Sequence, residues 1–258
     1  MNLDSILGLI ITITAAAALL FFWLRPQRKQ EHGAVSLRNL PALMQLRRAV
    51  GLAVEDGKRL HVSLGLSGGS AIPSAAGLVG LATLRRIAQL STLGDRPPVA
   101  TSGEPLVSLL SQDVLQTIYN QSGVGAQYRP TQARLTGITP FSYAAGALPV
   151  IRREQVYTNI LVGSYGAEIA LLCDASDRAG AFSLTASDTL TGQAAAFAAA
   201  CQPLIGEELF ALPAYIQAGP VHKASLLVQD LLRWVLIGAL LLGAVFKLVQ
   251  WILGGTGL

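Results

Sequence analysis

The sequence predicts an α/β fold of the Rossmann-like, doubly wound type, with a mostly parallel sheet flanked by N- and C-terminal transmembrane helices. Two observations predict it. Short β-branched runs alternate with longer helical stretches through the middle of the chain, which is typical of a parallel sheet covered by helices. Only 13% of the 258 residues are charged and 52% are hydrophobic, against about 25% charged residues in an average soluble domain. The deficit is concentrated near the two ends.

The N-terminal segment, residues 6–24, contains no charged residue. As a helix it would reach about 28 Å, close to the thickness of the hydrocarbon core of a bilayer. A cleaved signal peptide needs a positively charged start and a small-residue cleavage site. Here the start is MNLDS and the segment exits through Leu24-Arg25-Pro26. We therefore predict an uncleaved anchor over residues 1–26.

The C-terminal segment, residues 231–253, is apolar apart from Arg233, Lys247 and Gln250. Arg233 and Lys247 lie close enough to its ends for their long side chains to reach the head groups. The alternative, an amphipathic helix in the membrane interface, requires a clear polar face, which is missing. A second transmembrane helix is predicted over residues 224–254.

Gly238, Ala239 and Gly243 give this second helix a face of small residues, which allows another helix to approach closely. Such a face fits contact between the chain's own two helices or between copies in a homo-oligomer or larger membrane complex. Gly and Ala are also common in membrane helices that make no such contact.

Positive charge lies on the inner side of both segments. Arg25, Arg28 and Lys29 follow the first, and Lys223 and Arg233 precede or open the second, whereas the two tails carry no Lys or Arg. Cytoplasmic loops are enriched in these residues. The central domain is therefore predicted to be cytoplasmic, with both termini outside the membrane.

The middle of the chain is predicted to contain a linker and a first helix over residues 27–60, then one soluble α/β domain over residues 61–220. Four units in it repeat a short strand, a Gly/Ser loop and a helix. The strands are HVSLG, PPVATSG, YTNILVG and AFSLTAS, with helices over 74–91, 104–121, 167–178 and 190–212. A weaker unit, RLTGI followed by TPFSYAAGALPVI, lies between the second and the third.

Small hydroxyl or glycine residues follow the predicted strands. Because the carboxyl ends of parallel strands share one edge, where ligands bind in such sheets, these residues form a candidate site for a nucleotide or another anion. Tight turns and helix starts prefer the same residue types when nothing binds, which leaves a purely structural explanation open. The candidates are Ser67, Gly68, Gly69, Ser102, Gly103, Ser164, Ser187 and Asp188.

One stretch, Gly65-Leu66-Ser67-Gly68-Gly69, matches the GxSxG pattern of a hydrolase nucleophile between a predicted strand and helix. The only later histidine is His222, beside the second membrane segment. Ser67 is therefore a weak candidate for a catalytic serine, because a triad needs a histidine within reach.

Other chemistry is not indicated. A P-loop and a GxGxxG fingerprint are absent, and no acidic residue is recognised at the expected distance after the second strand. The three histidines are far apart, so we expect no metal, and no cofactor is indicated. The net charge is only +4 with scattered arginines, which gives no nucleic-acid surface. Cys173 and Cys201 are expected to be buried thiols. Two cysteines allow a disulfide by number alone, but a cytoplasmic location argues against it.

Three blocks of the chain, DRPPVATSGEP (95–105), RLTGITPFSYAAGALPVI (134–151) and the stretch PLIGEELF to LLRW (203–234), resemble a family of bacterial two-pass membrane proteins of unknown function. The resemblance runs from about residue 40 to the second membrane segment. It implies anchoring in a bacterial inner membrane and transfers no functional residue.

These features favour a non-enzymatic, membrane-anchored scaffold or assembly subunit with a cytoplasmic α/β domain, since no complete catalytic constellation is present. The first alternative is a ligand-sensing domain that binds a nucleotide or other anion at the strand-end crevice. A serine hydrolase at Ser67 is the second.

Overall fold

A computed structural model describes residues 3–24, 39–66, 73–92, 94, 96–199 and 201–254. The chain forms two compact units. One, Leu37–Ala218, is the α/β domain, and the other combines the two terminal segments, Met1–Ser36 and Gly219–Leu258.

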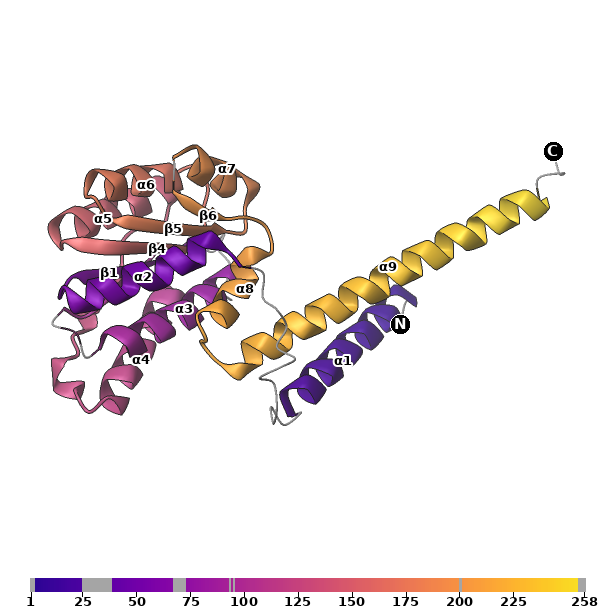
Figure 1. The fold of residues 1–258 in the computed structure, drawn as a ribbon, viewed down its shortest axis with the longest axis horizontal. Coiled ribbons are helices and arrows are strands. Elements are labelled where there is room, and N and C mark those ends of the chain that lie inside the picture. Colours follow the sequence, from indigo (N-terminus) through magenta and orange to yellow (C-terminus); the bar gives the residue numbers. More distant parts are fainter. Residues whose placement is uncertain are drawn as a thin grey trace. The chain divides into compact units, whose positions relative to one another are not determined.

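The α/β domain contains a six-stranded parallel sheet of order β3-β2-β1-β4-β5-β6 (Figure 1). The chain winds outward from β1 to β3, returns to β4 on the other side of β1, and then winds outward to β6. In chain order the elements are α2 (Pro41–Glu55), β1 (Arg59–Gly65), α3 (Ala75–Ser91), β2 (Val99–Ser102), α4 (Pro105–Gln121), η1 (Gly125–Gln127), η2 (Pro130–Gln132), β3 (Ala133–Leu135), α5 (Pro140–Arg153), β4 (Val156–Ser164), α6 (Ile169–Arg178), β5 (Phe182–Ser187), α7 (Leu190–Ala198), β6 (Gln202–Leu204) and α8 (Glu208–Tyr215).

Helices cover both faces of the sheet (Figure 1). On one face, Leu60, Val62 and Leu64 of β1 share an apolar core with buried residues of α2, α3, α4 and α8. On the other, Leu161 of β4 packs with buried residues of α5, α6 and α7. Burying each large aliphatic side chain contributes about 1.5–3 kcal/mol, so the two cores hold the three layers together.

The predicted parallel α/β sheet is confirmed, and the weak unit RLTGI with TPFSYAAGALPVI forms β3 and α5. The predicted helix over 190–212 is wrong, because the chain there forms α7, the short strand β6 and α8. Pro203 explains the difference, since a proline disfavours a helix interior but is tolerated in an edge strand. The alanine-rich sequence before β6 is typical of a helix, so local sequence favoured one continuous helix over this short strand.

The cysteine prediction is half right. Both side chains are buried, but Cys173 of α6 and Cys201, just before β6, form a disulfide with their Cα atoms 6.0 Å apart. The expectation of two separate thiols is wrong, because the fold brings together two residues that are 28 positions apart.

The terminal unit consists of α1 (Leu3–Leu24) and α9 (Pro220–Gly254), which contact each other. In the part of the chain that the structure describes, Val221–Trp251 of α9 is the one helix long and apolar enough to cross a membrane. The apolar stretch found in α1, Thr12–Phe22, is shorter than a span. One candidate membrane helix is thus found, and the two-pass topology stays a prediction.

Replacing Gly163 with alanine should strongly destabilise the α/β domain, because the new Cβ would lie 2.1 Å from the backbone oxygen of Leu64. Overpacking of this kind costs about 1–3 kcal/mol or more, which would lower the melting temperature by roughly 5–10 °C. Thermal unfolding of the full chain in detergent, followed by circular dichroism, measures the effect.

The matched control is Gly51→Ala, on an exposed position of α2 where an added Cβ meets nothing within 4 Å. Alanine favours a helix over glycine by about 0.5–1 kcal/mol, so this variant should melt slightly higher than wild type. Equal melting temperatures for the two variants would contradict the close contact between β1 and β4.

Candidate functional site

The carboxyl edge of the sheet is built around a close approach of β1 and β4. Gly65 has a φ of +66°, and a Cβ there would lie 2.5 Å from the backbone oxygen of Ser164. The next amide, of Leu66, donates to that same oxygen at 2.9 Å, and Gly103 donates to the oxygen of Gly65 at 2.9 Å. Since the winding direction reverses between β1 and β4, this is where ligands bind in sheets of this order.

The structure places five of the eight candidate residues at this edge, but the side chains of several of them bond to nearby backbone groups. The Ser187 hydroxyl accepts from the amide of Tyr165 at 3.2 Å and is 2% exposed. The N-cap of α7 is Thr189, whose hydroxyl accepts from Gly192, rather than Asp188, which is exposed. These contacts match the structural explanation, in which the residues form turns and helix starts. The remaining members at the edge are Ser102, Gly103 and Ser164.

The other candidates, Ser67, Gly68 and Gly69, lie outside the described residues. His222 belongs to the terminal unit, whose placement relative to the domain is not defined. A catalytic serine at Ser67 therefore stays a prediction.

Glu104 is the residue at this edge that sequence reasoning missed. It is the N-cap residue of α4, two positions after β2, and it is 7% exposed. Both of its carboxylate oxygens are buried and have no hydrogen-bond partner among the described residues. Ser102 fixes its backbone, because the Ser102 hydroxyl accepts from the Glu104 amide and donates to the Glu104 carbonyl, both at 3.0 Å.

An acidic residue directly after β2 is a recognisable signal in a doubly wound sheet. It was overlooked because the expected spacing is counted from a glycine-rich loop, and the 17-residue α3 carries the acid farther along the chain. The absence of an acidic residue at the expected distance therefore does not exclude one at the end of β2, where Glu104 lies.

A buried polar network lies under α5 and α6, on the second face of the sheet. His61 Nδ1 lies 2.7 Å from Asn159 Oδ1, and its Nε2 lies 2.9 Å from the Thr101 hydroxyl. The amide oxygen can only accept, so Nδ1 carries a proton, and the lowered pKa of the ring leaves Nε2 unprotonated at neutral pH. Burial is the main cause that lowers the pKa of His61 to about 4.

The same network continues through Ser63, whose hydroxyl bonds Tyr143 and accepts from the Tyr165 hydroxyl at 2.8 Å. Burial raises the pKa of both tyrosines, so their hydroxyls remain protonated. Every one of these groups is at most 1% exposed and has a partner within the network. The arrangement therefore specifies how the helices dock on the sheet and is closed to substrate.

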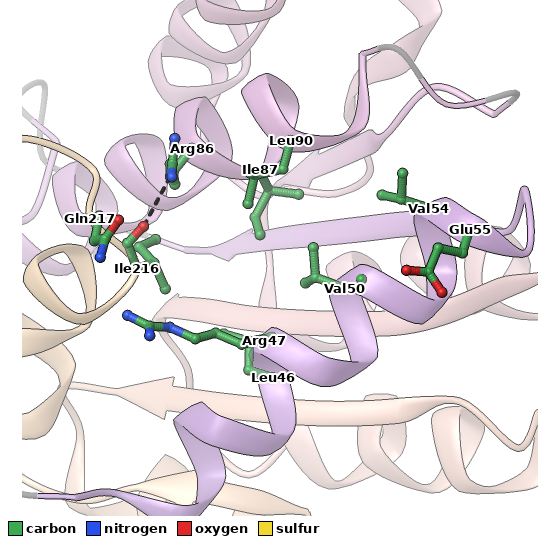
Figure 2. A pocket seen from close by; sticks show the side chains of 11 residues that line it. Leu46, Arg47, Val50, Val54, Glu55, Arg86, Ile87, Leu90, Ile216 and Gln217 are labelled. Carbon is green, nitrogen blue, oxygen red and sulfur yellow. Dashed lines mark hydrogen bonds between the residues drawn. The ribbon is translucent and has the colours of Figure 1, made fainter.

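An apolar groove of about 430 Å³ lies between α2 and α3 and is closed by the end of α8 (Figure 2). Leu46, Val50 and Ile87 line its floor, and Arg86 Nε donates to the carbonyl of Ile216 at 2.9 Å. Arg47 bonds the carbonyl of Tyr215 in the same way. The two arginines satisfy the last carbonyls of α8, so their contacts are structural.

A family model described as a domain of unknown function, DUF6754, matches residues 1–256. The chain belongs to this family. The resemblance to an uncharacterised family is thereby confirmed, while its bacterial origin stays a prediction. Searches of curated proteins and of solved structures found no match. The DUF6754 match covers both terminal segments as well as the domain between them.

The DUF6754 domain should lose stability in acid through His61. Its folded pKa of about 4 lies below the usual 6.5, so the unfolded chain binds the extra proton first as the pH falls. The contribution is fully present above about pH 6.5 and is lost toward pH 4, for a total of roughly 3 kcal/mol. Denaturant unfolding across this range measures it.

The control is His61→Gln, whose side-chain amide supplies a donor and an acceptor in place of the two ring nitrogens but does not titrate. It should flatten the pH dependence of the unfolding free energy between pH 6.5 and 4. If wild type and variant respond identically to pH, another group is responsible.

Proposed function

We propose that this protein is a membrane-anchored binding protein whose α/β domain takes a nucleoside-containing ligand at the carboxyl edge of its sheet. Glu104 carries the proposal. It combines burial, a carboxylate without a partner among the described residues, and the position directly after β2. In doubly wound sheets of order 3-2-1-4-5-6, an acidic residue near this position accepts hydrogen bonds from a ribose.

The energetics support a ligand with hydroxyl donors. A buried carboxylate without hydrogen bonds is unfavourable by several kcal/mol. The start of α4 offsets part of this, since the N-terminal end of a helix favours negative charge. Two vicinal hydroxyls could donate to the two carboxylate oxygens, which is the geometry that a ribose offers.

Glu104→Gln should weaken nucleotide binding by about 10- to 100-fold, because hydrogen bonds to a charged group contribute about 1.5–3 kcal/mol. A thermal-shift panel of mononucleotides and dinucleotides on the full chain in detergent selects the ligand, and calorimetry measures its affinity. The dideoxy counterpart of the selected nucleotide should bind as weakly to wild type as the parent binds to the variant.

Without ligand, Glu104→Gln should melt higher than wild type, because it removes a buried charge. Asp177→Asn, at an exposed position of α6, is the matched control. It should change neither the nucleotide affinity nor the melting temperature without ligand. If no nucleotide shifts the melting temperature of wild type, the proposed function is wrong.

The anchor is proposed to be two-pass, in a bacterial inner membrane, with a cytoplasmic domain and both termini outside. The charge-free apolar segment 6–24, the candidate span in α9 and the arginines and lysines beside them support this topology. The disulfide argues for the opposite side, since disulfides persist in oxidising compartments. In the cytoplasm we expect Cys173 and Cys201 to be reduced.

Single-cysteine variants test the topology, in a background without the two native cysteines. Asn2→Cys and Thr256→Cys should react with a membrane-impermeant maleimide in intact spheroplasts, because both tails are expected outside. Asp177→Cys should react only after lysis. Labelling of Asp177→Cys in intact spheroplasts would place the domain on the outer side, and protection of Asn2→Cys would contradict a spanning α1.

The scaffold hypothesis shares this anchor and stays a prediction. Its support is the small-residue face of α9, where Gly238 and Gly243 have open space around them in the described part of the chain. Self-association through that face is compatible with a ligand-binding domain, so the two hypotheses do not exclude each other.

A further inference from the structure

A polar cavity of about 530 Å³ lies at the amino edge of the sheet, opposite the edge that holds Glu104. Arg59 opens β1 and Arg134 lies in β3. Arg129 lies between the turns η1 and η2, and Gln132 is the last residue of η2. Tyr119 of α4 lines the cavity as well. Its volume is within the range of about 300–1,000 Å³ that is typical of small-molecule sites.

Three buried polar atoms around this cavity have no hydrogen-bond partner among the described residues. They are Arg59 Nε, the Tyr119 hydroxyl and Gln132 Oε1. Tyr119 is 1% exposed and Gln132 is 5% exposed, so neither is an ordinary surface side chain. Buried polar groups in proteins are almost always hydrogen-bonded. Their concentration around one hollow therefore indicates a polar occupant.

The charges around the cavity indicate the sign of that occupant. Arg59, Arg129 and Arg134 contribute three positive charges, and one carboxylate, Glu154, pairs with both Arg59 and Arg134. Pairing leaves the Nε of Arg59 free, and Arg129 is exposed at the rim. Among the described residues the surplus is about two positive charges, which matches a phosphate monoester with about −1.5 to −2 at pH 7.

Gln132 Oε1 and the Tyr119 hydroxyl indicate which other groups the ligand carries besides its anion. Gln132 Oε1 can only accept, so an anion alone leaves it unsatisfied. Burial raises the pKa of Tyr119, and the neighbouring Gln132 side chain and Arg59 partly oppose this. Its hydroxyl lies beside Gln132 without an aligned hydrogen bond, so it stays protonated and able to donate. A ligand with both a phosphate and hydroxyl groups satisfies the donors and the acceptor together.

We propose that this basic cavity, formed by Arg59, Tyr119, Arg129, Gln132 and Arg134, binds a phosphorylated polyol such as a sugar phosphate. The phosphate is held by the arginines, which bind phosphate oxygens in bidentate fashion. The hydroxyls of the polyol donate to Gln132. This site is independent of Glu104 and of the nucleoside proposed there.

Calorimetry on the full chain in detergent at low ionic strength tests the proposal, with glucose 6-phosphate as the probe. Glucose and inorganic phosphate, each of which has half of the required chemistry, should bind at least tenfold more weakly. In a parallel arm the full chain is held in detergent-free nanodiscs of neutral lipid, and vesicles of phosphatidylglycerol, whose head group carries phosphate and hydroxyls on a lipid, are titrated. Competition between the vesicles and glucose 6-phosphate shows which source the site prefers.

Two variants locate the binding. Arg129→Gln should weaken glucose 6-phosphate by tenfold or more, and Tyr119→Phe, which removes only the buried hydroxyl, should weaken it severalfold. Arg85→Gln makes the same charge change on an exposed position of α3 and should have no effect. Glu104→Gln should also leave this binding intact, which separates the site from the proposed nucleoside site.

Binding of the sugar phosphate or of the vesicles that is lost with Arg129→Gln supports the proposal and identifies the source. Absence of binding by both probes at millimolar concentration overturns it and leaves ordered water as the occupant. Equal weakening by Arg85→Gln and Arg129→Gln also overturns it, since the attraction would then come from overall charge.

Discussion

The pairing of β1 with β2 on one side and β4 on the other is the constraint on which the rest of the domain depends. All residues of β1 except Arg59 are buried, so helices must cover both of its faces. The faces differ in chemistry. Leu60, Val62 and Leu64 enter an apolar core, whereas His61 and Ser63 need hydrogen bonds that only β2, β4 and the helices above them provide. Because both faces of β1 must be satisfied, β1 lies between β2 and β4 and is covered by helices on both sides.

This strand order gives the two edges of the sheet opposite characters. At the carboxyl edge, the hydroxyls of Ser102, Ser187 and Thr189 bond to the backbone of turns and helix starts, and Glu104 lies buried at the start of α4. At the amino edge, arginines gather where the preceding helices end. Negative charge is favoured at a helix N-terminus and positive charge at a C-terminus, so both arrangements agree with the helix dipoles. The two sites that we propose for the domain therefore differ in chemistry, with hydroxyl donors expected at one edge and a phosphate at the other.

The end of the domain, from the last turn of α8 to Ala218, is held in one conformation by hydrogen bonds. Gln217 has a φ of +59°, and the amides of Gln217 and Ala218 donate to carbonyls of Ala214 and Pro213. These bonds form a Schellman motif, which ends α8 cleanly. Arg47 and Arg86 bond the adjacent carbonyls of Tyr215 and Ile216. The end of the domain at Ala218 is consequently held by side chains from α2 and α3, far away in the sequence.

Local patterns in the sequence determined the alternation of strands and helices, because burial on both faces makes parallel strands short and apolar and gives helices their own period. The same patterns determined the apolar terminal segments. They could not show that Pro203 lies in an edge strand, that Cys173 and Cys201 form a disulfide, or that His61 is hydrogen-bonded to Asn159. Each of these depends on contacts between distant segments. The two candidate sites were hidden for the same reason. Glu104 becomes notable only through its burial at the end of β2, and the arginines of the basic cavity, scattered from residue 59 to residue 134, meet only when the sheet brings the amino ends of its strands together.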